Sequence, residues 1–166
     1  MKTMAVKACS EWLADRGIPE APYGSPQSEQ FPLPPEASRS SSVIRRLLEV
    51  CCPFGSALLQ FTDWPVYEQD EMAVAVALRT SYGEPGPLID TPGHMFAAGE
   101  ADLLSGMFSL AAFYHWSAYL YFDHRTIVHC WEGDLLDLWV PDPVRLGDMR
   151  DVFAVHSLSS TLEISR

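Results

Sequence analysis

The fold is decided by residues 100–140, which read EADLLSGMFSLAAFYHWSAYLYFDHRTIVHCWEGDLLDLWV. Residues Glu100–Tyr114 carry apolar side chains in nearly every helical direction, which predicts a helix that is buried on more than one side. The remainder predicts three short strands, Ser117–Phe122, Thr126–Trp131 and Leu135–Val140, joined by links short enough for hairpins. We therefore expect an antiparallel meander packed against a central helix.

The alternation of side chains along these strands predicts which residues share a face of the sheet. If both turns have two residues, the face that meets the helix carries Ala118, Leu120, Phe122, Ile127, His129, Trp131, Leu136, Leu138 and Val140. The opposite face then carries Tyr119, Tyr121, Val128, Cys130, Asp137 and Trp139. A shift of one residue at either turn would move the side chains of one strand to the other face.

The chain before residue 56 predicts two helices that are joined by an extended arm. Residues 1–16 show helical spacing of apolar side chains, followed by the stop signals Gly17 and Pro19. The segment 18–42 is rich in proline and serine. Its spaced apolar residues favour an ordered arm that lies over the body, with a flexible linker as the alternative. Ser42 is positioned to cap a second helix, Val43–Cys52.

The middle of the chain predicts a strand, a helix and a loop. The strand is expected over residues 56–62, and Asp63-Trp64-Pro65 then resembles a helix start. Residues 72–78 alternate between large and small side chains, which also fits a strand, but the start signal and the stop signal at Gly83 favour a helix. Residues 84–99 contain three prolines and three glycines and are therefore expected to form a loop.

Beyond residue 143 the pattern of apolar residues is weaker. It predicts two short edge strands, Val152–Val155 and Thr161–Ile164. Together these features predict one α+β domain over residues 1–166. We expect a small, mainly antiparallel sheet packed on the buried central helix, with further helices flanking it.

Charge and composition exclude several classes of partner. The formal net charge is −11, so nucleic acid and anionic membrane surfaces are not expected partners, because both are bound through lysine and arginine. No apolar run approaches the roughly 20 residues of a membrane span. The four cysteines are scattered and no signal-peptide pattern is present, so we expect a cytoplasmic protein with reduced thiols.

The sequence contains no familiar catalytic, metal-binding or nucleotide-binding motif. HExxH, CxxC, the P-loop, GxGxxG and GxSxG are all absent. His129 and Cys130 are neighbours on a predicted strand, so their side chains point to opposite faces and cannot both bind one ion. We therefore predict no catalytic residue, no metal and no cofactor.

The aromatic face of the meander is the strongest candidate for binding, because tyrosine and tryptophan are enriched at binding hot spots. The predicted partner-binding residues are Tyr119, Tyr121, Asp137 and Trp139. The alternative is structural: the proline-rich arm could cover the same rings through Tyr23 and Phe31.

Combined with the net charge, this face predicts an acidic protein of the inhibitor or immunity type that docks stoichiometrically on a basic protein. A homodimer through the same face is a further possibility. The alternative function is a small-molecule-binding domain or a hydrolase-like enzyme. Its pocket would lie beside the 84–99 loop and use His94, Asp123, His124 or Cys130. A deep pocket with converging polar groups would favour the enzyme, and an exposed aromatic patch would favour the binding protein.

Overall fold

The computed structural model describes residues 1–25, 29–63, 68–84 and 90–161. Within these ranges the chain forms a seven-stranded antiparallel sheet with the strand order β1-β4-β3-β5-β6-β7-β2, which confirms the α+β class. The strands are β1 (Lys2–Met4), β2 (Glu29–Pro32), β3 (Ser56–Phe61), β4 (Gly93–Ala97), β5 (Ala118–Phe122), β6 (Ile127–Trp131) and β7 (Leu135–Trp139). The α-helices are α1 (Val6–Asp15), α2 (Ala37–Cys51), α3 (Gln69–Ser81), α4 (Ala101–Phe113) and α5 (Pro143–Val155).

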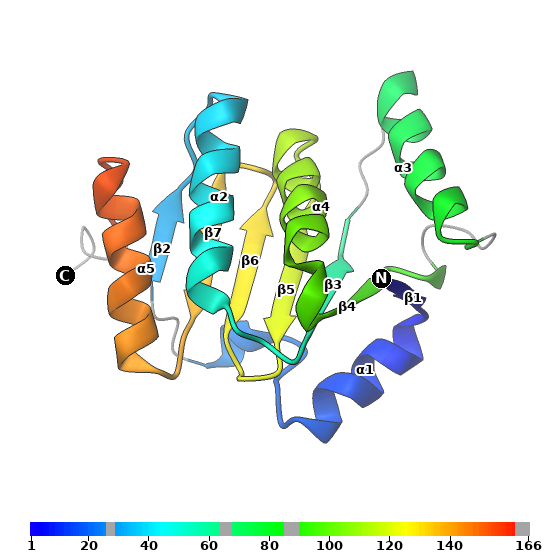
Figure 1. The fold of residues 1–166 in the computed structure, drawn as a ribbon, viewed down its shortest axis with the longest axis horizontal. Helices are drawn as coiled ribbons and strands as arrows, with labels where there is room; N and C mark the ends of the chain where they lie inside the picture. The colour runs from blue at the N-terminus through cyan, green and yellow to red at the C-terminus, as the bar shows by residue number, and fades with distance from the viewer. Residues whose placement is uncertain (26–28, 64–67, 85–89, 162–166) are drawn as a thin grey trace.

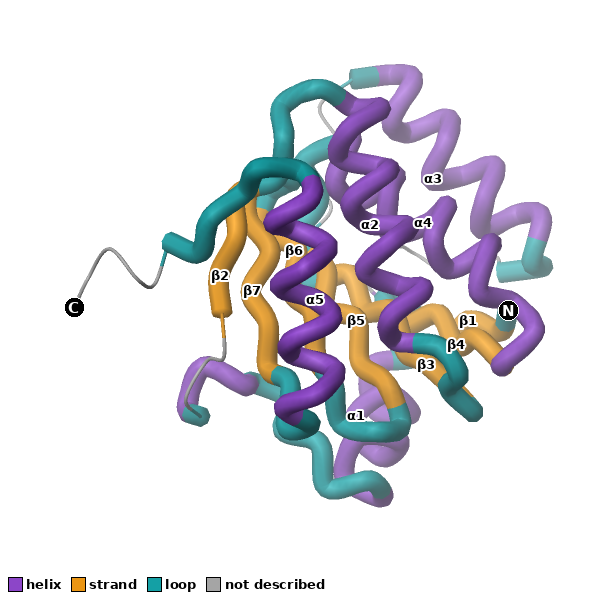
Figure 2. The backbone as a smooth tube through the Cα atoms, turned by 60° about the vertical axis from the view of Figure 1, so that its left-hand side comes forward, coloured by secondary structure: helices purple, strands orange, loops and turns teal. Residues whose placement is uncertain are grey.

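The helices cover the two faces of the sheet unequally. Figure 1 shows α2, α4 and α5 side by side in front of the sheet, and Figure 2 shows α1 behind it. α3 lies beside the β4 end of the sheet in Figure 1. No helix in the described ranges has both the length and the apolarity to cross a membrane. We call the face under α2, α4 and α5 the helical face, and the other the second face.

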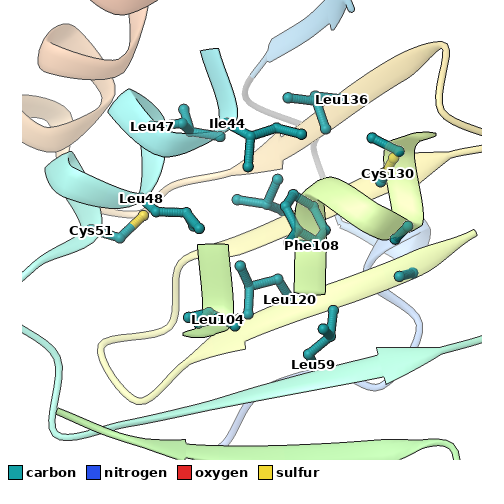
Figure 3. Packing of buried hydrophobic residues seen from close by; sticks show 14 of the residues in the cluster. Ile44, Leu47, Leu48, Cys51, Leu59, Leu104, Phe108, Leu120, Cys130 and Leu136 are labelled. Atoms are coloured by element: carbon teal, nitrogen blue, oxygen red, sulfur yellow. The ribbon is translucent and has the colours of Figure 1, made fainter. Parts of the chain in front are cut away.

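Each face has its own hydrophobic core. On the helical face, the inward rows of α2 and α4 meet the sheet, and Ile44, Leu47, Leu104 and Phe108 are fully buried there (Figure 3). On the second face, a smaller cluster joins α1 to the sheet through Cys9, Leu13, Ile18, Leu58, Tyr121, Ile127 and Trp139. Burying each large apolar side chain contributes about 1.5–3 kcal/mol, so the larger cluster dominates the stability of the fold.

Several predicted elements are confirmed. The central helix, the three strands of the meander and the strand near residues 56–62 all form at nearly the predicted positions. Residues 72–78 are helical, as part of α3. This helix begins after Glu68, which forms a capping box with Glu71. The helix start predicted at Asp63-Trp64-Pro65 falls largely on residues 64–67, outside the described residues.

The N-terminal predictions need two corrections. The first helix does not begin at residue 1, because Lys2–Met4 pairs with β4 as an edge strand. The arm does lie over the body, but it is shorter than residues 18–42. It contains β2, and α2 begins at Ala37 rather than at Val43. The serines between 38 and 42 misled the prediction: serine is a weak helix former, but its small cost is outweighed by the packing of the buried residues of α2.

The predicted loop at 84–99 also needs correction, because it contains the strand β4. Gly93 contributes to the loop prediction, but its role is packing: a Cβ there would lie 2.2 Å from the Cys9 Sγ. Residues Val152–Val155 are not a strand but the last turn of α5, a helix that Asp142 caps through the Val144 amide at 2.9 Å.

Only Thr161 of the predicted strand Thr161–Ile164 lies within the described residues. Its amide donates a hydrogen bond of 2.8 Å to the carbonyl oxygen of Gln30 on the edge strand β2.

The register of the meander differs from the prediction in one strand. The Phe122 amide donates to the Thr126 carbonyl oxygen at 2.9 Å and Trp131 pairs with Leu135, so the turns at 123–125 and 132–134 each have three residues rather than two. Arg125 and Gly133 in these turns adopt positive φ values of 66° and 74°, which turn the chain within three residues. The side chains of β6 are therefore reversed: Ile127, His129 and Trp131 lie on the second face, and Val128 and Cys130 lie in the helical core. The assignments for β5 and β7 are confirmed.

Candidate interaction site

The reversed strand β6 brings His129 to the centre of a polar and aromatic cluster on the second face. In the sheet His129 lies between Tyr119 of β5 and Asp137 of β7. Its imidazole stacks on the Tyr119 ring with a centroid distance of 4.0 Å and an angle of 18°. Its Nδ1 lies 3.5 Å from Oδ2 of Asp137. Three adjacent strands thus place a phenol, an imidazole and a carboxylate in one row.

The N-terminal arm completes this cluster. Tyr23 lies in a short 3-10 turn, Pro22–Gly24, and its hydroxyl is 2.7 Å from Nδ1 of His129. The same hydroxyl donates a hydrogen bond to Oδ2 of Asp137, and the amide of Gln30 donates to Oδ1 at 2.7 Å. The Tyr23 ring meets the Trp139 ring edge to face at 4.9 Å. Both oxygens of the buried Asp137 are therefore hydrogen-bonded, which offsets the cost of burying the carboxylate.

The tyrosines of this cluster remain hydrogen-bond donors at neutral pH. Burial raises the pKa of Tyr23, and the hydrogen bond to Asp137 raises it further. Burial also raises the pKa of Tyr119, with the Asp137 charge adding to the effect. The pKa of Tyr121 is raised mainly by burial, and its hydroxyl donates to the Glu20 carbonyl oxygen at 2.9 Å. The arm is thus fixed to the sheet at two points, Glu20 and Tyr23.

Two rings of the cluster are open to solvent. Tyr23 is 48% exposed and Trp131 is 49% exposed. Tyr119 is partly exposed beside them. Trp131 meets the His129 ring edge to face at 5.7 Å, so all three rings contact the same histidine. We call Tyr23, Tyr119, His129 and Trp131 the aromatic patch.

Only one of the four predicted partner-binding residues reaches this surface. Tyr121, Asp137 and Trp139 are 1%, 1% and 6% exposed and lie beneath the arm and α1, while Tyr119 is partly exposed. The prediction missed Tyr23 because it assigned that ring to structural cover. It missed Trp131 because the wrong register placed that ring in the helical core. With turns of three residues in place of two, the alternation along β6 would have placed Trp131 on the second face.

The surroundings of the aromatic patch are acidic. Glu20 precedes Tyr23 by three residues and Glu132 follows Trp131 directly, and both are exposed. Residues 17–25 and 126–140 contain no lysine or arginine. A partner that approaches the patch therefore meets negative charge without a neighbouring positive group from these segments.

The residues of the predicted alternative pocket are not brought together. Asp123 fixes the link between α2 and β3, because its carboxylate accepts from the amides of Gly55 and Ser56 at 2.9 and 2.8 Å. His124 stands beside it with Nε2 3.1 Å from the Cys51 carbonyl oxygen, and burial lowers its pKa. These hydrogen bonds give both side chains structural roles.

His94 and Cys130 lie apart from this pair and from each other. Cys130 lies within the helical core, where burial raises its pKa to about 12. His94 is on β4, which is separated from β6 by two strands, and burial lowers its pKa to about 4. A buried thiol with a raised pKa is a poor nucleophile. Nothing in this arrangement forms the predicted pocket beside residues 84–99, of which 85–89 lie outside the described residues.

A cavity of about 380 Å³ lies elsewhere, at one end of the helical face. Residues 33–41, 109–115 and 133–134 contribute its lining. Within the described ranges, no three histidine, cysteine, aspartate or glutamate side chains are grouped so that they could hold a metal ion.

Comparison with known protein families, with curated proteins and with solved structures finds no significant match to this chain. The function must therefore be argued from the geometry of the chain itself.

Proposed function

We propose that this chain is an acidic, stoichiometric binding protein of the inhibitor or immunity type, which docks on a basic protein through the aromatic patch. The observation that supports this most directly is the convergence of three partly exposed rings on the buried His129, in a chain of net charge −11. Tyrosine and tryptophan rings with large exposed area are the residues that most often dominate binding energy.

The patch suits a partner rich in lysine and arginine. Cationic side chains are attracted to the faces of exposed Trp131 and Tyr23, and a desolvated cation–π contact is worth about 2 kcal/mol. Glu20 and Glu132 at its border add attraction for the same groups. The net charge would steer the encounter, and burial of the rings would slow dissociation.

The patch is also preorganised. Hydrogen bonds hold Tyr23 to His129 and Asp137, and stacking holds Tyr119 against His129. Rings that are already fixed lose little conformational entropy on binding, so more of the contact energy is retained as affinity.

The test begins with affinity capture from the native host, in which the wild type is compared with Tyr23→Ala/Trp131→Ala. Val155→Ala is the matched control, because Val155 is an apolar residue that is 82% exposed on α5. We expect the wild type and the control to retain one basic protein. Reconstitution from purified components should then give a 1:1 complex, and the double variant should weaken it by at least about 30-fold. The association rate should fall steeply with added salt.

Two outcomes would contradict this proposal. Equal retention of the partner by the double variant would exclude the aromatic patch as the docking surface. Recovery of only a second copy of the chain would instead make the patch a homodimer interface. Unfolding curves of each variant must accompany the binding data, so that loss of binding is separated from loss of fold.

A further inference from the structure

The first turn of α2 breaks the apolar pattern of that helix. The inward row of α2 carries Ile44, Leu47 and Cys51, all fully buried, but the row begins with Ser40. Ser40 is only 8% exposed. Among the residues that the structure describes, none forms a hydrogen bond with its hydroxyl, and the hydroxyl oxygen is still accessible to solvent. This hydroxyl therefore remains available to donate a hydrogen bond to a ligand.

Ser40 lines the cavity of about 380 Å³. In Figure 1 the first turn of α2, the last turn of α4 and the link between β6 and β7 meet at the upper end of the sheet. Ser109 and His115 add further polar groups to the lining, while Leu33 and Phe113 provide apolar walls. The volume and the mixture of apolar walls with a few polar groups are typical of small-molecule sites.

The N-terminus of α2 offers hydrogen-bond donors beside this cavity. No side chain caps it, and the amides of Arg39 and Ser40 donate to the Glu36 carbonyl oxygen, so the amides of Ala37 and Ser38 are left to donate. His115 donates from Nδ1 to the Glu132 carbonyl oxygen at 2.6 Å, so Nε2 of the neutral ring is an acceptor and adds no donor for an anion.

Two carbonyl oxygens nearby are already occupied, and two nearby carboxylates face water. The carbonyl oxygens of Leu110 and Ala111 at the end of α4 accept hydrogen bonds from Tyr114 and Trp116. The carboxylate of Asp134 is 75% exposed, and Glu36 is 58% exposed and pairs with Arg39 at 3.6 Å. Solvent screens both charges, so they oppose an anion in the cavity only weakly.

We propose that this cavity binds the carboxylate group of a molecule with an apolar body. The carboxylate accepts hydrogen bonds from the Ser40 hydroxyl and from the amides of Ala37 and Ser38, and the apolar body packs on Leu33 and Phe113. Such a carboxylate is available from a small organic acid or from the C-terminus of a peptide. The site lies at the end of the helical face and is separate from the aromatic patch, so neither proposal depends on the other.

The test is an NMR titration of the full chain with two pairs of probes. Phenylacetate and its neutral analogue phenylacetamide represent a small organic acid, and acetyl-Leu-Phe with a free or amidated C-terminus represents a peptide end. We expect at least one acid to bind about tenfold more tightly than its amide and to shift the amide signals of residues 37–41. Binding by phenylacetate supports a small-molecule ligand, and binding by the peptide acid alone supports a chain terminus.

Ser40→Ala should weaken this binding about tenfold, while the matched Ser42→Ala, at an exposed position of the same helix, should leave it unchanged. Trp131→Ala should also have no effect. Equal affinity for acid and amide, an unchanged affinity in Ser40→Ala, or failure of every probe to bind in the millimolar range would each overturn the proposal.

Discussion

The two faces of one sheet are built in different ways. The helical face is covered by three helices and closes over a large apolar core. The second face is covered by α1 and the arm, and its smaller apolar cluster adjoins the hydrogen-bonded group of Tyr23, His129 and Asp137. The comparison indicates that the helical face supplies most of the stability, while the second face leaves aromatic side chains exposed.

The faces also treat ionisable groups differently. On the helical side, His94 has a pKa lowered to about 4, mainly by burial, with the charge of Arg79 adding to the effect. On the second face, the buried Asp137 is held by hydrogen bonds to both of its oxygens. Burial thus disfavours the charged form of His94, whereas hydrogen bonds offset the cost of burying Asp137.

The largest loss of stability should come from a substitution in the helical core. Phe108→Ala removes a fully buried ring beneath α4 and should lower the free energy of unfolding by about 3–5 kcal/mol, because it leaves a cavity. Phe113→Ala is the matched control on the same helix, where the ring is 57% exposed, and it should change the stability by less than about 0.5 kcal/mol. Urea unfolding measures both. Similar losses for the two variants would contradict the assignment of stability to this core.

A second substitution tests the turn that sets the register of β6 against β7. Gly133 has a φ of 74°, and a Cβ there would lie 2.2 Å from the Ala112 carbonyl oxygen of α4. Gly133→Ala should therefore cost about 2–3 kcal/mol through backbone strain and the clash. Gly106→Ala is the control: a Cβ at this exposed helical position meets nothing within 4 Å, and it should stabilise the chain by up to about 1 kcal/mol. Thermal and urea unfolding distinguish the two, and a neutral Gly133→Ala would contradict the turn geometry.

Acidification should lower the free energy of unfolding through His94, which lies on the helical face. Its pKa is about 4 in the fold and 6.5 in the unfolded chain, so the unfolded state binds more protons between these values. The stabilisation that depends on neutral His94 is complete above about pH 6.5. It decreases as the pH is lowered and is smaller by about 2 kcal/mol at about pH 5. Urea unfolding of the wild type and of His94→Gln at about pH 7 and about pH 5 measures it. The variant should lose this part of the pH dependence, and parallel behaviour of the two proteins would contradict it.

The sequence predicted the α+β class, the central helix and the three meander strands, because long apolar periodicity and short polar links are local signals. It did not predict the edge strands β1 and β2, or β4, which lies between β1 and β3. These have three to five residues, and their pairing depends on partners far away in the chain. Composition was misleading for β4, where Gly93 serves close packing rather than a turn.

The prediction of the candidate site depended on the register of β6, in which a shift of one residue moves every side chain to the other face. Tyr119 and Asp137 were correctly placed on one face, but the extra residue in each turn moved His129 and Trp131 to that same face. Positive φ at Arg125, a non-glycine residue, gave no sequence signal for the longer turn. The cavity beside Ser40 was also invisible, because it requires α2, α4 and the β6–β7 link to meet in space.

The smallest loss of stability should come from a substitution of Tyr23. This residue has two separable roles: its hydroxyl fixes the arm on the sheet, and its ring forms part of the aromatic patch. Tyr23→Phe keeps the ring but removes the hydroxyl that bonds His129 and Asp137, so it should lower the free energy of unfolding by about 1.5 kcal/mol. If the ring itself is the binding element, Tyr23→Phe should bind the partner nearly as well as the wild type, and Tyr23→Ala should bind much more weakly. Equal losses of affinity in both variants would instead show that the hydroxyl, by fixing the arm on the sheet, is what the second face needs to present its rings.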